Sequence, residues 1–225
     1  MKTGAIYHFT NGSEIRPIVN EKQIEALKRF ATSKGIDIKK IYCDYTLKTS
    51  EQEAFMTFMK ECEEYEYLVT KDFYHIRDKT TICMKVMKEL RDKGITIVSM
   101  ENGIFSFSEE PFDKPLRVVT YTQENGKIRD AEGSVDMQND IFSLFAKRKT
   151  GWTIIHHYSD ICFHQNDAEQ LQLKELIKHK DEYDLVLVNN LGDIHKRTAR
   201  LCKVREQIGK DIFSMQDGFL KYEKE

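Results

Sequence analysis

The chain has 225 residues, a length that suits one large domain or two small ones. An apolar fraction of 40% and only 3 prolines are typical of a folded protein and exclude an intrinsically disordered one. The formal net charge is −2 and the pI is about 6.4, so the chain lacks the basic excess of most proteins that bind DNA phosphates. A local basic face in the folded protein would still permit DNA binding.

Neither a membrane span nor a secretion signal is visible in the sequence. No apolar run approaches the roughly 18–20 residues that a membrane span needs. The N-terminal residues MKTGAIYHFTNGSE lack the apolar core of a signal peptide. We therefore expect a cytoplasmic protein without membrane contact. The 5 cysteines include no CxxC pair, which disfavours a disulfide framework or a zinc ribbon and favours buried, reduced thiols.

The first half of the chain alternates apolar runs with amphipathic stretches. Strands are predicted at residues 4–9, 38–44, 65–71 and 95–102, and helices at residues 22–35, 50–64 and 78–94. Leu27 and Ala31 lie on the apolar face of the first helix, which should stop at Gly35, and Ser50 is the expected N-cap of the second helix. That second helix should face the core with Phe55, Met56, Phe58 and Met59, which could alternatively form a protein-binding face.

The second half repeats this order of strands and helices, with predicted elements at residues 117–122, 136–151, 152–160, 167–180, 183–189, 196–209 and 211–217. Four landmarks recur in sequence at a distance of about 115 residues: Tyr7 with Tyr121, Gln23 with Gln138, Asp44 with Asp160, and Ser99 with Ser214. An ordered repeat over nearly the whole chain predicts a tandem duplication of one structural module.

The repeat sets the expected domain organisation. Copy 1 covers residues 1–110, copy 2 covers residues 115–225, and the segment EEPFDKP between them reads as a linker. Strands that alternate with helices predict an α/β fold, in which each module is a mainly parallel sheet flanked by helices. The near-continuous apolar run 65–71 is typical of a strand buried in such a sheet.

The order of these elements, together with several polar positions, resembles the catalytic domain of the serine recombinases of the resolvase/invertase type. The positions that correspond to the family motif are Tyr7, Phe9, Asn11, Gln23, Asp44, Tyr74 and Arg77. The tyrosine, the glutamine, the aspartate and the last arginine match the family. Phe9 replaces an arginine, and Asn11 replaces the serine that attacks DNA. Tyr74 replaces the first of two later arginines.

Copy 2 departs further from the family motif. Its corresponding residues are Tyr121, Gln123, Asn125, Gln138, Asp160, Gly192 and His195. Gln123 and Asn125 stand at the positions of the first arginine and the nucleophilic serine. Gly192 and His195 stand at the two later arginine positions, so this copy keeps none of the family's guanidinium groups at them.

The resemblance implies attack of a serine hydroxyl on a DNA phosphodiester, with cations held around the phosphate. An asparagine amide is no comparable nucleophile, and Arg77 alone supplies little charge to the transition state. We therefore expect a pseudo-enzyme without a cofactor that acts as an interaction or regulatory module, with a protein partner or with itself. Because the family works as dimers, the two copies could form an intrachain pseudo-dimer. We expect no room for the family's dimerisation helix or helix-turn-helix after Gly218.

Two alternatives stay open. In the first, the protein binds DNA or is a weakly active site-specific recombinase, with Ser13 as a displaced nucleophile and Arg77 with Asp44 as the remnant of an anion site. Ser13 otherwise reads as a turn residue, and Arg77 and Asp44 as an ordinary ion pair or surface residues. In the second, a small ligand binds at the strand end Asn189–Asp193, although the chain has no phosphate-loop motif.

The sequence also contains a cluster of residues that could suggest a metal site. Four residues with metal-binding side chains lie close together: His156, His157, Cys162 and His164. Adjacent residues on a strand point to opposite faces of the sheet, and the spacing fits no compact tetrahedral motif. We therefore expect no metal.

Overall fold

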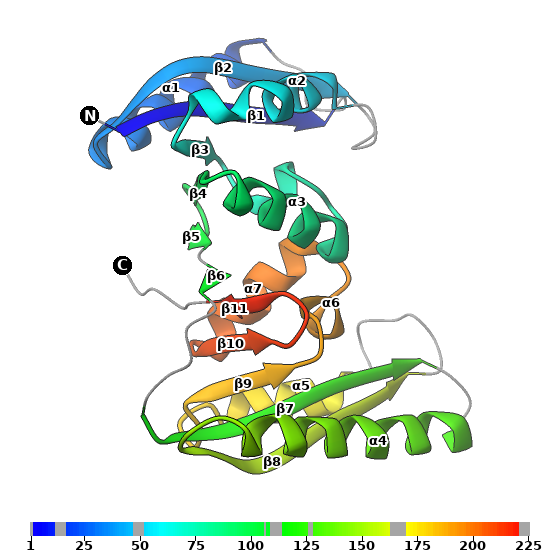
Figure 1. Ribbon diagram of the computed structural model, residues 1–225. Helices are drawn as coiled ribbons and strands as arrows, with labels where there is room; N and C mark the ends of the chain where they lie inside the picture. Colours follow the sequence, from blue (N-terminus) through cyan, green and yellow to red (C-terminus); the bar gives the residue numbers. More distant parts are fainter. Residues whose placement is uncertain are drawn as a thin grey trace. The chain divides into compact units, whose positions relative to one another are not determined.

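The computed structural model describes residues 2–11, 17–46, 52–105, 107–108, 114–125, 128–162 and 170–220, with the backbone alone at several range ends. The chain divides into two compact units (Figure 1), Met1–Ser106 with Arg197–Ala199, and Phe107–Lys196 with Arg200–Tyr222. Each unit contains its own sheet and its own helices, so each is described by itself.

The first unit contains a five-stranded sheet with strand order β2-β1-β3-β4-β5. Its elements are β1 (Lys2–Asn11), α1 (Pro17–Ser33), β2 (Ile36–Thr46), α2 (Glu53–Glu61), the 3-10 turn η2 (Cys62–Glu64), β3 (Tyr67–Thr70), the 3-10 turn η3 (Phe73–His75), α3 (Thr80–Asp92), β4 (Thr96–Ser99) and β5 (Gly103–Phe105). Strands β2, β1, β3 and β4 are parallel, and β5 is antiparallel to β4.

The second unit contains a six-stranded sheet with strand order β6-β11-β10-β9-β7-β8. The remaining elements are β6 (Phe107–Ser108), β7 (Leu116–Asn125), α4 (Ile128–Lys147), β8 (Trp152–Cys162), α5 (Leu171–Lys178), β9 (Leu185–Val188), α6 (Leu191–Ile194), α7 (Thr198–Ile208), β10 (Asp211–Ser214) and β11 (Gly218–Leu220). Strands β8, β7, β9 and β10 are parallel, β11 is antiparallel to β10, and β6 is antiparallel to β11. The predicted fold class, two α/β modules that are each a mainly parallel sheet flanked by helices, is confirmed.

Helices cover both faces of the first sheet because adjacent strand residues point in opposite directions. On one face, Leu27 of α1 packs with Ile6 of β1 and Val69 of β3. On the other face, the ring of Tyr7 in β1 lies 4.8 Å from the ring of Phe55 in α2, centroid to centroid. This double cover explains why Leu68, Val69 and Thr70 of β3 are all buried.

The second sheet is covered in the same way by its own helices. On one face, Phe142 and Ala146 of α4 pack against Val118 of β7 and Leu187 of β9. Helix α5 buries Leu173 and does not share this cluster, because it packs beside β8 on the other face (Figure 1). Burial of these apolar side chains is the main stabilising contribution in each unit.

The start of α2 differs from the prediction. The helix begins at Glu53, and its N-cap residue Gln52 makes no side-chain cap hydrogen bond to the helix. The expected cap, Ser50, lies outside the described residues. A carboxylate from the preceding strand β2, that of Asp44, satisfies the helix amides instead.

The predicted apolar face of α2 is only partly correct. Phe55 and Phe58 are fully buried, but Met56 is 52% exposed and Met59 is half-buried. A helix buries one stripe of side chains, and Met56, adjacent to Phe55, falls outside that stripe. The short antiparallel strands β5 and β11, each of which begins with a glycine, were absent from the predicted elements.

Both sheets contain an irregularity at the same place. The pairing of β1 with β2 shifts register between Gly4 and Ala5, and the pairing of β7 with β8 shifts between Val118 and Val119. In each case the edge strand gains one extra residue, as in a β-bulge. At Gly4 the strands approach closely, since a Cβ there would lie 2.5 Å from Ile36 Cγ2.

Two glycine substitutions test this packing. Gly4→Ala is expected to lower the free energy of unfolding by about 1–3 kcal/mol, because the new methyl group overlaps Ile36. Gly133→Ala, in helix α4 with no neighbouring atom within 4 Å, is the matched control and should raise it by about 0.5–1 kcal/mol. Urea unfolding followed by circular dichroism measures both. An unchanged midpoint for Gly4→Ala would mean that β1 and β2 separate freely at the bulge.

Candidate functional site at the carboxyl ends of the strands

A buried tyrosine–aspartate pair ties the first sheet to helix α2. The Tyr7 hydroxyl donates to Asp44 Oδ2 at 3.0 Å. The same carboxylate accepts the backbone N–H of Ala54 at Oδ1 and that of Phe55 at Oδ2, each at 2.9 Å. Asp44 therefore provides the N-terminal cap of α2 that was predicted for Ser50. Burial is the main cause that raises the pKa of Tyr7, and the adjacent carboxylate of Asp44 raises it further, so the phenol stays protonated at neutral pH.

Arg77, at the family's second later arginine position, makes contacts inside the fold. Its Nη1 donates to the carbonyl oxygen of Ile76 at 2.8 Å. Its guanidinium carbon lies 4.8 Å from the ring centroid of Phe55, in a cation–π arrangement. Burial lowers the pKa of Arg77, but a guanidinium remains charged at neutral pH. Asp44 and Arg77 are thus both tied to Phe55, the first through the backbone amide and the second through the ring.

The end of β1 is apolar where the family carries its first arginine. Phe9 is buried, and its ring centroid lies 5.8 Å from that of His75. His8, on the opposite face of the strand, is also buried, with its Nε2 2.9 Å from Thr10 Oγ1. Burial lowers the pKa of His8, so its imidazole is neutral at pH 7. Neither Phe9 nor the neutral His8 therefore supplies positive charge here, and the nearby Lys71 is paired with Glu101 at 3.4 Å.

The other motif residues of the first unit lie around this network. Gln23 is half-buried on α1, and Tyr74 is half-buried in η3, where its ring lies 5.8 Å from the ring of His75. Asn11 is the last residue of β1, but its side chain lies outside the described residues, and Ser13 lies outside them entirely. The structure thus brings Tyr7 and Asp44 into direct contact and places Arg77 beside them.

One participant was not identified from the sequence. Gln52 is buried just before α2 and donates from Nε2 to the carbonyl oxygen of His75 at 2.9 Å, which ties the start of the helix to η3. Gln170, just before α5, makes the same bond to the carbonyl oxygen of Ile194 at 3.1 Å. The recurrence of this glutamine in the two halves is the sequence signal that would have revealed it.

The second unit reproduces the tyrosine–aspartate pair. The Tyr121 hydroxyl donates to Asp160 Oδ2 at 3.0 Å. The carboxylate of Asp160 accepts the backbone N–H groups of Gln172 at 2.9 Å and Leu173 at 3.0 Å. The aspartate after the second strand therefore caps the following helix in both units, with the same three hydrogen-bond donors.

At the arginine positions the second unit has uncharged or buried residues. Gln123 replaces the first arginine, and its Oε1 accepts from Gln170 Nε2 at 3.4 Å. His195, at the last arginine position, is buried. The remaining positions are Gly192 within α6, Gln138 half-buried on α4, and Asn125, whose side chain lies outside the described residues.

The strand end Asn189–Asp193 uses its polar groups within its own turn and in bonds to the turn after β10, where Asp217 Oδ2 accepts the backbone N–H of Leu191 at 2.8 Å. The backbone N–H of Asn190 donates to Asp193 Oδ2 at 3.0 Å, and Asn190 Nδ2 donates to Asp193 Oδ1 at 2.8 Å. Burial raises the pKa of Asp193 to about 6, the bonds from Asn190 oppose this rise, and Glu124 and Asp217 add to it. These contacts stabilise the short helix α6.

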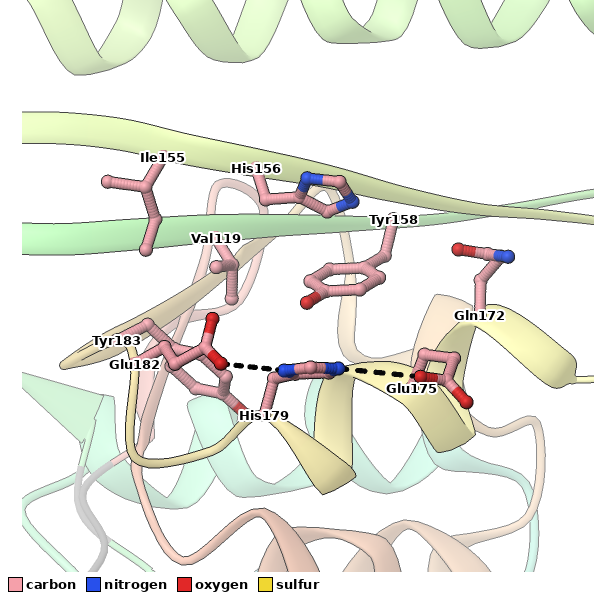
Figure 2. Close-up of a pocket in the computed structure, with 9 residues that line it drawn as sticks. All are labelled: Val119, Ile155, His156, Tyr158, Gln172, Glu175, His179, Glu182 and Tyr183. Atoms are coloured by element: carbon pink, nitrogen blue, oxygen red, sulfur yellow. Dashed lines mark hydrogen bonds and ion pairs between the residues drawn. The ribbon is translucent and has the colours of Figure 1, made fainter.

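The second unit also has a pocket of about 370 Å³ between strand β8 and helix α5 (Figure 2). His156 and Tyr158 line it from the strand, and their ring centroids are 4.3 Å apart. His179 lies between two carboxylates, with its Nδ1 2.7 Å from Glu182 Oε1 and its Nε2 3.5 Å from Glu175 Oε2. The bond to Glu182 raises the pKa of His179, which favours the charged imidazolium.

The corresponding place in the first unit carries a different arrangement. The strand registers align Lys40 of β2 with His156 of β8. Lys40 Nζ lies 2.6 Å from Glu61 Oε2, and the Tyr42 hydroxyl donates to the same carboxylate. In the first unit a lysine–glutamate pair therefore connects the strand to α2, whereas in the second unit histidines line the pocket.

The histidines of β8 do not converge. His156 lines the pocket, whereas His157 Nδ1 lies 2.7 Å from Thr120 Oγ1 on the neighbouring strand. His164 and the side chain of Cys162 lie outside the described residues. Within the described part of the chain, no three His, Cys, Asp or Glu side chains are placed to hold a metal ion. None of the helices in that part combines the length and apolarity that crossing a bilayer requires.

Comparison with known families identifies a recombinase relation for part of the chain. The family model "Resolvase, N terminal domain" matches residues 19–121, a stretch from α1 to β7. The predicted resemblance to serine recombinases is confirmed for this stretch. Strand β1 lies entirely before the matched residues, so the positions of Phe9 and Asn11 are outside the match.

Solved structures and curated sequences give weaker support for the recombinase relation than the family match does. The N-terminal catalytic domain of TP901-1 integrase is 16% identical, with 45% of this chain and 79% of that chain covered and a TM-score of 0.40. A resolvase family site-specific recombinase from Streptococcus pneumoniae is 13% identical, with coverages of 65% and 94% and a TM-score of 0.42. Caulobacter myo-inositol binding protein is 12% identical, with coverages of 94% and 74% and a TM-score of 0.29. No curated protein sequence matches the chain. The relation to recombinases therefore depends on the family match.

The tyrosine–aspartate pair predicts an order of stabilities. Asp44→Ala is expected to lower the free energy of unfolding by about 2–4 kcal/mol, because it leaves a buried phenol and two helix amides without their acceptor. Tyr7→Phe should lower it by about 1 kcal/mol, because Asp44 keeps its bonds to the helix. Asp160→Ala and Tyr121→Phe are the matched pair and should rank in the same order in urea unfolding. An equal loss for Tyr7→Phe and Asp44→Ala would show that the phenol, and not the helix cap, dominates.

The raised pKa of Asp193 predicts a pH effect. Its pKa of about 6 in the folded protein exceeds the ordinary 3.8, so the folded state holds the proton more tightly and loses stability as pH rises between these values. Relative to the wild type, Asp193→Asn should therefore gain stability from pH 4 to pH 6 and level off above, in urea unfolding at a series of pH values. Asp184→Asn is the control, and its stability relative to the wild type should change with pH in the opposite direction, since Arg117 lowers the pKa of Asp184. If the difference in unfolding free energy between Asp193→Asn and the wild type did not change with pH, the raised pKa of Asp193 would be contradicted.

Proposed function

We propose that this protein is a catalytically degenerate relative of the serine recombinases that acts as a non-enzymatic interaction or regulatory module in a process linked to DNA recombination. One observation carries the proposal. At the end of β1 the buried ring of Phe9 packs against His75, and the neighbouring Arg77 already contacts Phe55 and the Ile76 carbonyl group. Phosphoryl transfer needs cations around the phosphate in the transition state. Among the described residues, this strand end offers the half-buried guanidinium of Arg77 and the ammonium of Lys71, which is already paired with Glu101 at 3.4 Å.

The identity of the residues at the nucleophile position supports the same proposal. Asn11 stands where the family carries its serine, and an amide lacks an oxygen that a base can activate for attack on phosphorus. Ser13 is two residues further along, in a sequence, NGSE, that is typical of a turn. A site that lacks both the expected hydroxyl and most of its cations would need two independent replacements to be active.

We further propose that the two units are copies of one module, residues 1–110 and 115–225. The strand order, the position of the bulge and the aspartate cap recur in both units. The hydroxyl groups of Ser99 and Ser214 also recur, each donating to the carbonyl group just after the neighbouring parallel strand, at 2.8 and 3.1 Å. Polar contacts of this kind depend on specific side chains, so their recurrence supports duplication more strongly than a shared topology does.

A duplicated module without its reactive groups retains a surface on which other chains can assemble. The partner that fits this proposal is an active recombinase, another dimeric protein or a second copy of this chain, in the cytoplasm. The net charge of −2 does not require DNA as a direct partner. The two copies within one chain could also form a pseudo-dimer.

Two other functions each have an observation in their favour. The family match at residues 19–121 favours a DNA-binding or weakly active recombinase that would use Ser13 and Arg77. The pocket beside α5, with its histidines and carboxylates, favours a small-ligand binding module. A ligand that binds the folded state alone raises the unfolding temperature, so a thermal-shift screen with and without His179→Ala would detect this second function.

The proposed loss of catalysis predicts the result of a cleavage assay. The protein is expected to produce no detectable strand break and no covalent DNA adduct on nicked or supercoiled DNA. Loss of the nucleophile should lower the cleavage rate by a factor on the order of a million relative to an active enzyme. Denaturing gels and mass spectrometry of the protein after incubation measure both. A covalent adduct that disappears in Ser13→Ala would overturn the proposal.

Variants that restore single family residues separate the two losses. Asn11→Ser returns the hydroxyl group but leaves Phe9 in the arginine position, and we expect it to remain inactive in the same assay. The variant with both Asn11→Ser and Phe9→Arg returns the hydroxyl group and the arginine together, and is compared with Asn11→Ser alone. Cleavage by Asn11→Ser alone would show that the missing cations are supplied elsewhere, and would contradict the argument from Phe9.

A further inference from the structure

Helix α4 carries an apolar stripe that its own unit does not use. Met137, Ile141 and Leu144 are 62%, 39% and 58% exposed. Their spacing of four and then three residues places them on one face of the helix. Exposed apolar side chains that form a continuous stripe mark a protein interaction surface more often than scattered ones do.

The stripe is distinct from the face by which α4 contributes to the core. Phe142 and Ala146 are buried in that core, and Phe145 packs against it. The sheet beneath α4 is therefore already covered, and replacing the stripe by polar residues would leave the core intact. This separation makes the stripe a surface feature rather than part of the fold.

The corresponding helix of the first unit has no such stripe. Gln23 in α1 aligns with Gln138 in α4, and this alignment places Lys22, Ala26 and Arg29 at the stripe positions. Two of these three residues are charged. The apolar surface therefore belongs to the second unit alone, which argues against a requirement of the shared fold.

The charges on α4 are arranged so that two copies of the helix complement each other. Glu132, Asp136 and Asp140 are exposed in its first part, and Lys147 and Arg148 are exposed at its end. Two such helices in antiparallel orientation bring the acidic part of one beside the basic part of the other. In parallel orientation, like charges would be neighbours.

We propose that the protein forms a two-fold symmetric dimer in which α4 of one chain pairs with α4 of a second copy in antiparallel orientation through this stripe. In coiled-coil terms Met137 and Leu144 are d positions and Ile141 is an a position. Ile141 of each chain then lies opposite Leu144 of the other. The g positions, Asp140 and Lys147, face each other across the pair, which gives two equivalent ion pairs.

The size of the stripe sets the strength of the association. Three apolar side chains and two exposed ion pairs form a small interface of the kind found in transient complexes. The dimer should therefore dissociate on dilution, and added salt should weaken it because exposed charges are screened. This inference does not depend on whether the protein cleaves DNA.

Analytical ultracentrifugation of the full-length chain over a range of concentrations tests the dimer. We expect a reversible monomer–dimer equilibrium for the wild type and a monomer for Leu144→Glu, which places a charge in the stripe. Arg29→Glu, at the matching position of α1, is the control and should dimerise as the wild type does. Circular dichroism confirms that each variant is folded. A wild-type monomer at all concentrations, or a Leu144→Glu variant that still dimerises, overturns the proposal.

Charge reversal tests the orientation of the helices. Asp140→Lys and Lys147→Asp should each weaken dimerisation about tenfold, because each places like charges opposite each other twice. The variant with both changes restores opposite charges and should dimerise as the wild type does. Failure of the double variant to recover overturns the antiparallel pairing. A monomeric wild type in which Leu144→Glu lowers stability and Arg29→Glu does not would show that another part of the chain covers the stripe, and also overturns the dimer.

Discussion

The fold of each unit depends on one buried carboxylate that joins three elements. Asp44 lies near the end of β2, and it accepts one hydrogen bond from Tyr7 of β1 and two from the first turn of α2. A buried carboxylate is stable only when it is fully hydrogen-bonded, and helix amides are orphan donors that need an acceptor. Each group satisfies the other, so the helix can start only where the two strands end. Asp160 and Tyr121 impose the same constraint on α5.

This constraint changes the meaning of the matches to the recombinase motif. Tyr7 and Asp44 agree with the family, yet in this structure both are engaged in holding α2 against the sheet. Side chains with such a role persist whether or not a reaction takes place. Phe9 has no comparable structural constraint from polar groups, and here the family's arginine is replaced. The residues that match are therefore those the scaffold needs, and they say little about catalysis.

The sequence predicted the architecture better than it predicted the site. The repeat and the alternation of apolar runs predicted two mainly parallel sheets, because both are long-range patterns that many residues carry. The cap of α2 was assigned to Ser50 since sequence reasoning looks for a cap beside the helix, whereas Asp44 reaches it from another strand. Gln52 was missed for the same reason. Its bond to the His75 carbonyl group depends on how η3 approaches α2, which no local pattern encodes.

The differences between the units point to where the function of the second one has changed. Buried contacts recur in both units, but the exposed positions do not. Lys40 and Glu61 form an ion pair in the first unit, whereas His156 and His179 line a pocket in the second. If the units arose by duplication, selection has kept the internal hydrogen bonds of both and altered their surfaces separately. A protein that retained its scaffold for chemistry alone would show the opposite pattern, with its polar strand ends preserved and its surfaces free to vary.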